Sequence, residues 1–485
     1  MQSLLQEYVE DDSYLGPAAD GSFTGAAGGA ACGDLARISP VISDGRVESI
    51  SFDSEGCAAT RAACACVCEM VDGETVLDAA RIGPDDIEKE LGGLSPARRH
   101  AVVLTADALH RALSAAASSG MKLADADPDR VLVAVSGGVD SAVAALRERE
   151  RGAEVVAVTV KLWADPNTDG TKACCSPEAV LGARAVTPSL GSPHFTLDLE
   201  NQFREQVVGE FVRGYGEGRT PNPCVLCNGE VRIAAMVDLA DRLGATHLVT
   251  GHYARIVDDG SGALLADGED SSKDQSYMLA ALPTEVISRL SFPLAEITKT
   301  EVRRIAEENE LSVAKKPESQ DLCFLAGQDK RDFLRRHGGL EERGGSVVDS
   351  SGTELGTHGG HHNFTVGQRR GLGVAAGHPL FVIDTDAESN TVTVGGRDEL
   401  TVDRVSVRDA VMHRDGSTVD RVRLRYHSET VPATVTADAG IHASLEVRLD
   451  EPFDRPAPGQ AAVLMSGDTV VGHATITRPS HNADK

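Results

Sequence analysis

Features that would assign the chain to a membrane or secreted class are missing from its sequence. No apolar run reaches the roughly 18–20 residues that a helix needs to cross a bilayer. The first residues, MQSLLQEYVEDDSYLG, are acidic and lack the basic and then apolar pattern of a signal peptide. We therefore expect a cytoplasmic protein, in which thiols stay reduced. Its ten cysteines are then better suited to be ligands, nucleophiles or buried thiols than structural disulfides.

Positive charge is also scarce, since 47 Lys and Arg residues stand against 74 Asp and Glu residues, a net charge of −27. A field of this sign repels polyanions on average and argues against a phosphate-rich partner. Basic residues nevertheless form local runs that could make a binding face: Arg303 and Arg304, Lys315 and Lys316, Lys330 and Arg331, Arg335 and Arg336, and Arg369 and Arg370. The net charge therefore excludes no nucleic-acid partner, because the distribution of charge decides.

At 485 residues the chain is too long for a single ordinary core, so we expect several domains. An Ala-rich first domain is predicted over 1–117, with strands near 47–53 and an amphipathic helix over 97–116, and a small, polar linker follows over 118–129. The remaining domains are predicted over the ranges 130–328, 329–397 and 398–485.

The hydrophobic pattern of the sequence changes at residue 131. The apolar run VLVAV (131–135) is typical of a buried parallel strand, and a predicted helix (141–150) and strand (154–163) follow it. The same alternation returns over 236–254, which predicts a doubly wound α/β sheet. From about residue 329 onward, short alternating runs rich in Gly, Thr and Val predict a central β-rich domain and a C-terminal β-barrel.

The string SGGVDS (136–141) lies between the first predicted strand and helix of this sheet. Its two glycines let the backbone turn tightly and aim N–H groups at an anion, and the helix N-terminus adds partial positive charge. Ser136 and Ser141 can donate hydroxyl hydrogen bonds. There is no G-K-[ST], so this is not a Walker-type loop. It matches the PP-loop of enzymes that split ATP into AMP and pyrophosphate, a loop that several ATP-using families share.

Eight sequence strings, spread over roughly residues 130 to 480, narrow the choice among these ATP-using families. They are AVSGGVDS (134–141), VKLW (160–163), GRTPNPCVLCN (218–228), TGHYAR (250–255), KDQSYML (273–279), FPL (292–294), ESQDLCFL (318–325) and HNFTVGQRRGLGV (362–374). In these strings the chain resembles the tRNA-specific 2-thiouridylases of the MnmA type. The resemblance implies a PP-loop ATP pyrophosphatase domain and a tRNA-uridine 2-sulfurtransferase activity.

In that family ATP with Mg²⁺ adenylates the 2-carbonyl oxygen of the wobble uridine, and sulfur then displaces AMP. The implied partners are the anticodon stem-loop of tRNA and a cysteine desulfurase or another sulfur donor. The base must leave the anticodon stack to be reached. Two rival interpretations stay open: an adenylating sulfurtransferase with another substrate, and an iron–sulfur carrier whose ATP site is vestigial.

The resemblance also implies roles for single residues. Cys227 matches the family's nucleophile, and Cys323 matches the cysteine that carries a persulfide. The residues implied to line the ATP site are Ala134, Val135, Ser136, Gly137, Gly138, Val139, Asp140, Ser141, Val160 and Gly251. The residues implied to lie at the tRNA are Asn222, Pro223, Lys273, Asp274, Gln275, Arg425 and Tyr426. His252, in TGHY, is either structural or in contact with substrate or nucleotide.

Cys224 departs from a common family pattern, which has Asp at this position. In one interpretation Cys227 and Cys323 perform persulfide and disulfide chemistry and Cys224 is incidental. In the other, which we prefer, Cys224, Cys227 and Cys323 hold a 4Fe–4S cluster whose open iron carries the attacking sulfur. A zinc site is a weaker third option because four protein ligands are not evident. We expect no catalytic role for the adjacent pair Cys174 and Cys175, since adjacent thiols rarely bridge.

The first domain resembles the NifU/IscU scaffold for iron–sulfur clusters. The strings that carry this resemblance are AACGDLARI (30–38), FDSEGCAATRAA (52–63) and LSPARRHAVVLTADAL (94–109). It implies an α+β domain whose metal ligands fall at Cys32, Asp34, Cys57 and His100. Ala101 stands where the family has its third cysteine, so one ligand is missing.

Three outcomes remain for this domain. The four residues could hold zinc or a labile cluster through mixed S, O and N ligands. A cysteine of the predicted helix could substitute; Cys64 and Cys68 share one helix face while Cys66 points away, and all three are more typical of a core. The domain could also serve only for docking. We expect it to supply sulfur or a cluster to the catalytic cysteines, since fusion raises its effective concentration there.

Overall fold

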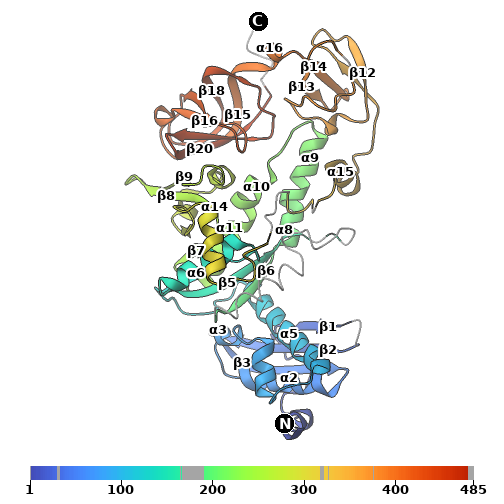
Figure 1. Cartoon of the computed structure of the whole chain (residues 1–485), viewed down its shortest axis with the longest axis vertical. Helices are drawn as coiled ribbons and strands as arrows, with labels where there is room; N and C mark the ends of the chain where they lie inside the picture. Colours follow the sequence, from blue (N-terminus) through green and yellow to red (C-terminus); the bar gives the residue numbers. More distant parts are fainter. Residues whose placement is uncertain are drawn as a thin grey trace.

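The computed structural model describes residues 2–29, 33–163, 165, 191–316, 322–325, 327–374 and 376–478. Four units follow one another along an elongated molecule, with the N-terminal unit at one end and two β-rich units at the other (Figure 1). This arrangement confirms the multidomain fold class predicted from the sequence. None of the described helices is both long enough and apolar enough to span a bilayer.

The N-terminal unit is a three-stranded antiparallel sheet, β1-β2-β3, with α2 and α5 packed against it and against each other. Its elements are α1 (Gln2–Glu10), β1 (Gly25–Gly28), β2 (Leu35–Ser43), β3 (Arg46–Glu55), α2 (Ala58–Val71), α3 (Val76–Ala79), α4 (Pro84–Glu90), η1 (Pro96–Arg98) and α5 (Arg99–Ser118). Alanines on the inner faces of α2 and α5 let the two helices approach closely.

The three cysteines of α2 belong to the core of this unit. Cys64, Cys66 and Cys68 are all fully buried. Cys66 does point away from the other two, but α1 covers that side of the helix. Burial raises the pKa of the Cys64 and Cys66 thiols to about 12, which keeps them protonated and poor metal ligands.

The second unit is a five-stranded parallel sheet with the order β10-β7-β4-β5-β6. Its elements are β4 (Arg130–Ala134), α6 (Val139–Glu150), β5 (Glu154–Lys161), β6 (His194–Asp198), α8 (Glu200–Gln202), η3 (Phe203–Val208), α9 (Gly209–Gly216), α10 (Pro223–Leu226), η4 (Cys227–Arg232), α11 (Ile233–Arg242), β7 (His247–Val249), α12 (Ser276–Leu279), α13 (Thr284–Ile287), β10 (Leu290–Ser291) and α14 (Lys299–Glu308). The strand order reverses between β4 and β7, and ligands bind such sheets at this point, beyond the carboxyl ends of the strands.

The third unit opens with a helix rather than a strand. Helix α15 (Lys330–Gly338) buries Phe333 and Leu334 on one face and exposes charged residues elsewhere. A four-stranded sheet follows, in the order β12-β11-β14-β13. Its elements are β11 (Gly345–Val348), β12 (Glu354–His358), η5 (His361–Asn363), β13 (Phe381–Asp386) and β14 (Thr391–Gly395).

The fourth unit is a six-stranded barrel closed by the pairing of β15 with β20. Its elements are α16 (Arg397–Leu400), β15 (Thr401–Met412), η6 (Gly416–Thr418), β16 (Arg421–Arg423), β17 (Val431–Val435), β18 (Gly440–Asp454), β19 (Ala461–Ser466) and β20 (Thr469–Ile476). A hairpin from earlier in the chain, β8 (Ala254–Asp258) and β9 (Ala263–Asp267), extends this sheet through a pairing with β20. Leu264 of the hairpin is buried in the barrel's core, so the second and fourth units are joined structurally.

The segment 118–129, predicted as a linker, is packed against the second unit. Leu123 is fully buried, and its N–H donates to the carbonyl oxygen of Arg242 at 2.8 Å. Helix α5 also docks on the sheet edge, because the Thr196 N–H of β6 donates to Ser114 Oγ at 3.0 Å. The N-terminal unit is therefore held in a set position and is not loosely tethered.

Gly25 allows α5 to lie directly on β1. A Cβ atom at this position would lie 2.0 Å from the carbonyl oxygen of Ala108 and 2.4 Å from the N atom of Ala112. We predict that Gly25→Ala lowers the free energy of unfolding by roughly 1–3 kcal/mol, because backbone atoms cannot move aside. Gly16→Ala is the control, since nothing lies within 4 Å of its Cβ position. Urea unfolding of both variants tests this, and equal stabilities would contradict the close packing.

Candidate functional site

The SGGVDS loop closes on itself at the carboxyl end of β4. Gly137 has φ +67°, a left-handed conformation that favours glycine. The Ser136 N–H donates to Ser141 Oγ at 3.1 Å, and that hydroxyl donates to the Gly138 carbonyl at 3.1 Å. Gly138 is the N-cap of α6. The loop thus presents the start of a helix toward the sheet's carboxyl edge, a geometry suited to a phosphate group.

Two lysines and a tyrosine approach this loop from elsewhere in the chain. Lys299 Nζ donates to both carboxylate oxygens of Asp140 at 2.6 and 2.7 Å, and Tyr253 Oη donates to the same carboxylate at 2.7 Å. Lys316 Nζ donates to the Gly137 carbonyl at 2.9 Å. Lys316 adds positive charge at the loop of a strongly acidic protein, which favours a polyphosphate there, whereas the charge of Lys299 is balanced by the Asp140 carboxylate.

Gly251 brings the loop after β7 against the phosphate loop. A Cβ atom on residue 251 would lie 2.8 Å from the carbonyl carbon of Asp140 and from the N atom of Ser141. Val160 is buried at the end of the neighbouring strand β5. The residues predicted for the ATP site, 134–141, Val160 and Gly251, therefore gather at one edge of the sheet.

The C-x-x-C pair occupies two short helical turns. Asn222 caps the first, α10, where its Oδ1 accepts the Val225 N–H at 3.2 Å. Cys224 is partly exposed in this turn, and Cys227 is buried at the start of the second turn, η4. Turn η4 is π-helical. Such turns are rare and are frequent at functional sites.

Cys323 lies in the short described stretch 322–325. Its neighbour Phe324 packs its ring against Phe203, Phe211 and Phe333, with centroids 5.9, 5.0 and 5.1 Å away. Cys323 packs against the same large apolar cluster that contains Cys227. Within the described residues, the sulfur atoms of the three predicted catalytic cysteines do not form a group whose members all lie within 4.8 Å. Both sulfur chemistries expected from the sequence therefore stay as alternatives.

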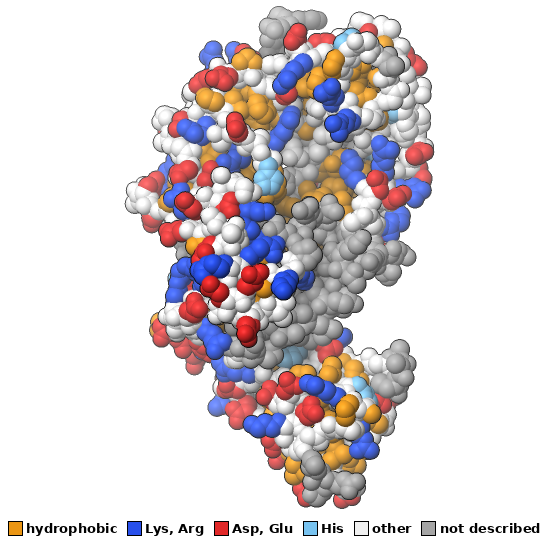
Figure 2. Space-filling view, in the orientation of Figure 1, with side chains coloured by type: hydrophobic (Ala, Val, Ile, Leu, Met, Phe, Trp, Pro, Cys, Tyr) orange, Lys and Arg blue, Asp and Glu red, His pale blue; other side chains and the backbone are white. Residues whose placement is uncertain are grey.

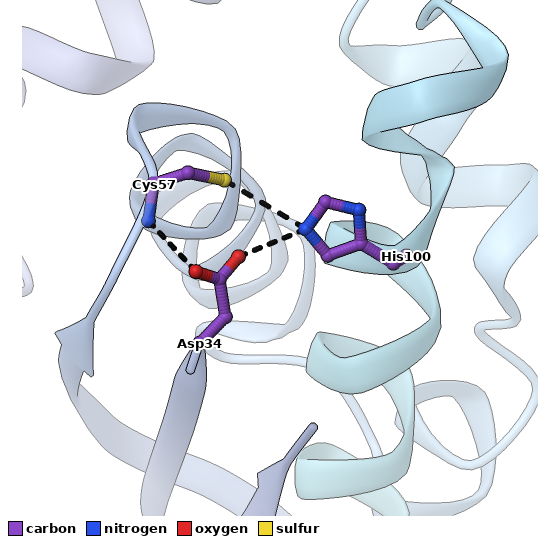
Figure 3. A group of neighbouring side chains, drawn as sticks. All are labelled: Asp34, Cys57 and His100. Carbon is purple, nitrogen blue, oxygen red and sulfur yellow. Dashed lines mark hydrogen bonds and ion pairs between the residues drawn. The ribbon is translucent and has the colours of Figure 1, made fainter. Parts of the chain in front are cut away.

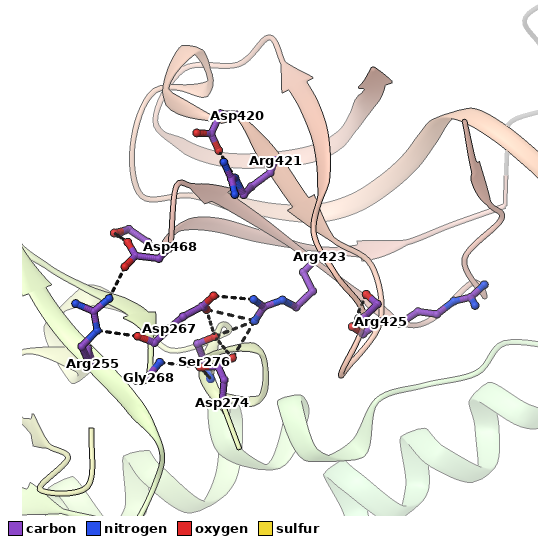
Figure 4. A network of polar contacts seen from close by, with 12 residues as sticks. Arg255, Asp267, Gly268, Asp274, Ser276, Asp420, Arg421, Arg423, Arg425 and Asp468 are labelled. Atoms are coloured by element: carbon purple, nitrogen blue, oxygen red, sulfur yellow. Dashed lines mark hydrogen bonds and ion pairs between the residues drawn. The ribbon is translucent and has the colours of Figure 1, made fainter. Parts of the chain in front are cut away.

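The segment predicted to contact tRNA is tied to the barrel by Arg423. Asp274 is buried, and its Oδ2 accepts from Arg423 Nη1 at 2.9 Å, while Asp267 accepts from Arg423 Nη2 at 2.7 Å (Figure 4). The neighbouring Gln275 accepts the Tyr253 N–H at 3.1 Å. The side chains of Asp274 and Gln275 thus hold the segment in place inside the protein, whereas Lys273 is more exposed than Asp274.

The barrel contributes two further predicted residues near the cysteine turn. Burial and the nearby charges of Asp274 and Cys224 raise the pKa of Tyr426, whose ring lies 6.0 Å from that of Tyr277. Arg425 donates to the Arg455 carbonyl at 3.0 Å. A cavity of about 750 Å³ opens at this junction. Its lining includes Asp274, Arg423, Tyr426 and His427.

Charge on the surface is mixed and does not follow the acidic average. On the face in Figure 2, basic side chains are interspersed with acidic ones, both over the β-rich units and over the described part of the middle unit. Basic groups are therefore available on this face despite the net charge of −27.

In the N-terminal unit, Asp34, Cys57 and His100 converge (Figure 3). Their ligand atoms all lie within 4.8 Å of one another, and His100 Nε2 is 2.9 Å from Asp34 Oδ2 and 3.9 Å from Cys57 Sγ. A hydrogen bond from Thr60, with others from Cys57 and His100, lowers the pKa of Asp34 to about 2. A carboxylate, a thiol and an imidazole form a donor set suited to zinc.

The other positions predicted for this site are either undescribed or offer no ligand. Cys32 lies outside the described residues, as do Cys174 and Cys175. Ala101 is fully buried in α5 and offers no ligand. His100 stands at the start of α5, whereas the docking contact with β6 comes from Ser114, 14 residues further along this helix and about 21 Å away at 1.5 Å per residue.

Several functional contacts were missed in the sequence. Tyr253 lies inside the string TGHYAR and Lys316 inside a basic pair, so a signal for both was present. Lys299 and Arg232, whose guanidinium contacts His252, lie outside every string that drew attention. Arg423 lies two residues before the predicted tRNA contact Arg425, in a run noted only for its β pattern. Their partners come from distant parts of the chain, which no local pattern shows.

Family models match the chain in four consecutive stretches. Residues 5–119 match the NifU-like N terminal domain, and 129–327 match the tRNA methyl transferase HUP domain. Residues 331–396 match the tRNA methyl transferase PRC-barrel domain, and 397–476 match the aminomethyltransferase beta-barrel domain.

One of the curated relatives matches nearly the whole chain, and two others match about three quarters of it. The bifunctional protein NifU/MnmA of Rubrobacter xylanophilus is 44% identical over 485 residues, which cover 97% of each chain. The tRNA-specific 2-thiouridylases MnmA of Geobacter metallireducens and Sorangium cellulosum are 42% and 43% identical. These two matches cover 72% of this chain and 96% and 92% of theirs.

The Arg423 network generates a stability prediction. Arg423→Ala leaves the carboxylates of Asp267 and Asp274 without their cation, and we expect the free energy of unfolding to fall by about 3 kcal/mol. Arg421→Ala is the matched control, because this residue of the same strand is half exposed and pairs with the exposed Asp420. Chemical unfolding measures both variants, and a change within about 0.5 kcal/mol in Arg423→Ala would contradict the role of the network.

Proposed function

The chain belongs to the family of NifU/MnmA fusion proteins, and we propose that it uses ATP to thiolate the 2-position of the wobble uridine in tRNA. One observation carries this proposal: residues 251–253 join the phosphate loop to the cysteine turn. Gly251 abuts the loop, Tyr253 binds Asp140, and His252 contacts Arg232 at the end of η4. An activated oxygen and an attacking sulfur would therefore meet in one place.

The chemistry follows from the two groups that this contact joins. A carbonyl oxygen is a poor leaving group, so the uridine 2-oxygen first attacks the α-phosphate of ATP. Pyrophosphate leaves with the electron pair of the broken P–O bond, and Mg²⁺ neutralises charge on the phosphates. Sulfur then bonds to C2 of the base, and AMP leaves with the electron pair of the C2–O bond.

The cavity at the barrel junction favours a large substrate. Tyr426 of the barrel and Asn222 before the cysteine turn both lie close to Tyr277, where a base flipped out of a stack could be received. Lys273 and Arg425 adjoin the cavity-lining residues Asp274 and Tyr426 in sequence and are our candidate contacts to the tRNA. A sulfurtransferase that acts on a small molecule does not need two β-rich units beside its site, which argues against the first rival function. An iron–sulfur carrier does not need an intact phosphate loop, which argues against the second.

The source of the sulfur stays a choice between two chemistries. Cys323 could carry a persulfide and Cys227 could release the product as a disulfide forms. A 4Fe–4S cluster held by Cys224, Cys227 and Cys323 would instead supply an open iron that carries the sulfur. In either case the cysteine desulfurase or other donor acts before the tRNA is thiolated.

We also propose that Asp34, Cys57 and His100 bind a metal or a labile cluster, with Cys32 as the fourth ligand. The converging S, O and N atoms support the site, and the missing cysteine at Ala101 favours a labile occupant. The N-terminal unit would then supply sulfur or a cluster to the cysteine turn. Because α5 fixes that unit on β6, the unit must undock, or must serve a neighbouring molecule, to reach Cys323.

The main test uses the full chain with ATP, unmodified tRNA and a sulfur source. We expect pyrophosphate release that depends on tRNA, and 2-thiouridine in the digested tRNA. Cys227→Ala and Cys323→Ala should each lower thiouridine formation by at least 100-fold while pyrophosphate release persists. Cys64→Ala is the control, because that thiol is buried in the N-terminal core. Pyrophosphate release without any need for tRNA would refute the proposed substrate.

Cys224→Ala separates the two sulfur chemistries. Turnover close to that of the wild type is expected if a persulfide on Cys323 is the donor, since Cys224 is then incidental. Loss of turnover together with loss of iron and sulfide from anaerobically purified protein is expected if the three cysteines hold a cluster. Iron and sulfide analysis beside the thiolation assay distinguishes these outcomes.

The N-terminal cluster predicts metal binding that depends on Cys57. Co²⁺ titrated into the full chain should produce thiolate charge-transfer absorption and release protons, because metal binding deprotonates the thiol. Cys57→Ser should lower the absorption, because it removes one of the two proposed thiolate ligands, whereas Cys68→Ala should leave it unchanged because that thiol is buried in the core and its pKa is raised by burial. Equal spectra from the wild type and Cys57→Ser would contradict the site.

A further inference from the structure

Arg232 is a partly buried cation whose hydrogen-bond partners are both neutral. Its Nη2 donates to Asn228 Oδ1 at 2.5 Å and to His252 Nε2 at 3.1 Å. Its Nε is buried and has no hydrogen-bond partner among the described residues. Over the same part of the chain no carboxylate forms an ion pair with it, in contrast to Arg130 and Arg423, which both bind carboxylates.

His252 orients this guanidinium without neutralising it. Burial and the nearby Arg232 charge lower the pKa of His252 to about 3, so the imidazole is neutral at physiological pH. Its Nδ1 lies 2.6 Å from Thr250 Oγ1, and a proton on Nδ1 leaves Nε2 free to accept from Arg232. A cation held by neutral groups retains its full charge for a ligand.

The position of Arg232 lies between the two reacting parts of the site. It ends the π-helical turn η4 that Cys227 begins, and such turns bond residue i to residue i+5, the spacing of these two residues. Through His252 it contacts the loop whose Gly251 abuts Asp140 and Ser141. The guanidinium therefore stands where a group bound at the phosphate loop would face the cysteine turn.

We propose that Arg232 is a catalytic residue that binds the α-phosphate, first of ATP and then of the adenylated uridine. The inference rests on the proposed function. A guanidinium has a planar fork of donors that matches phosphate oxygens, and its unused Nε–H adds to that fork. A desolvated cation without a counter-ion is unfavourable, and an arriving phosphate removes that penalty.

The proposed contact acts most strongly in the second step. When the uridine oxygen attacks, a P–O bond forms at the α-phosphate and the bond to pyrophosphate breaks. When sulfur then bonds to C2, the C2–O bond breaks and its electron pair leaves with AMP, so the α-phosphate group changes from a monoanion to a dianion. A cation placed between the phosphate loop and the cysteine turn stabilises this growing charge on the phosphate at the step where sulfur attacks.

Arg232→Gln and Arg232→Lys test the proposal in the full chain with ATP, tRNA and a sulfur source. We expect Arg232→Gln to lower kcat for thiouridine formation about 100-fold, with a smaller rise in KM for ATP. Arg232→Lys keeps the charge but not the fork, and about a tenfold loss is expected. Arg213→Gln is the control, because that arginine is exposed on α9 and pairs with Glu210. Wild-type kcat in both Arg232 variants would overturn the proposal.

A second measurement separates phosphate binding from activation of Cys227. The rate of Cys227 alkylation is followed against pH without nucleotide, in a protein that lacks Cys224 and Cys323. We expect the same pH midpoint in the wild type and Arg232→Gln backgrounds. A midpoint that moves up by a pH unit in Arg232→Gln would mean that Arg232 stabilises the thiolate instead, and would overturn the assignment to the α-phosphate.

Two further outcomes keep the proposals distinct. A wild-type protein that forms no thiouridine and releases no pyrophosphate with tRNA would sink the proposed function itself. If the wild type is active and the Arg232 variants have the same kcat, only the proposed role of Arg232 is refuted. If thermal unfolding shows that Arg232→Gln is unfolded, Arg232→Lys carries the test, and its unchanged kcat overturns the proposal.

Discussion

The close approach of two loops at Gly251 is the constraint on which the catalytic arrangement depends. No side chain fits there, because a Cβ atom would lie 2.8 Å from the backbone of the phosphate loop. This contact fixes the position of the next two residues, so that Tyr253 reaches Asp140 and His252 reaches Arg232. One glycine thus sets the distance between the phosphate loop and the turn that carries Cys227.

The acidic character of the chain is compatible with this site because the cations are placed individually. Lys299 and Lys316 contact the phosphate loop, and Arg232 stands at the cysteine turn with neutral partners. Arg423, by contrast, forms ion pairs with two carboxylates and so joins the barrel to the second unit. Two arginines therefore have different roles, depending on whether a carboxylate lies within hydrogen-bonding distance of the guanidinium.

Packing fixes the N-terminal unit on the second unit, although the sequence between them predicts a flexible linker. A polar stretch after α5 predicts a loose tether, yet Leu123 is buried and α5 is docked on β6. The cluster of Asp34, Cys57 and His100 lies at the far end of the same helix. Transfer from this cluster to the cysteine turn would then need undocking or a second molecule, because a rigid helix keeps the two sites apart.

The sequence by itself determined the order of the domains, the phosphate loop and the cysteine pair, because each is written in a short contiguous string. The parallel strands were predictable from apolar runs, whereas the helix α15 and the β8–β9 hairpin of the barrel sheet were not foreseen. Only the tertiary structure decided that Asp274 is an internal anchor, that Cys66 is covered by α1, and that no acid among the described residues pairs with Arg232. Burial and charge pairing depend on residues that are far away in the chain, so local sequence patterns cannot predict either of them.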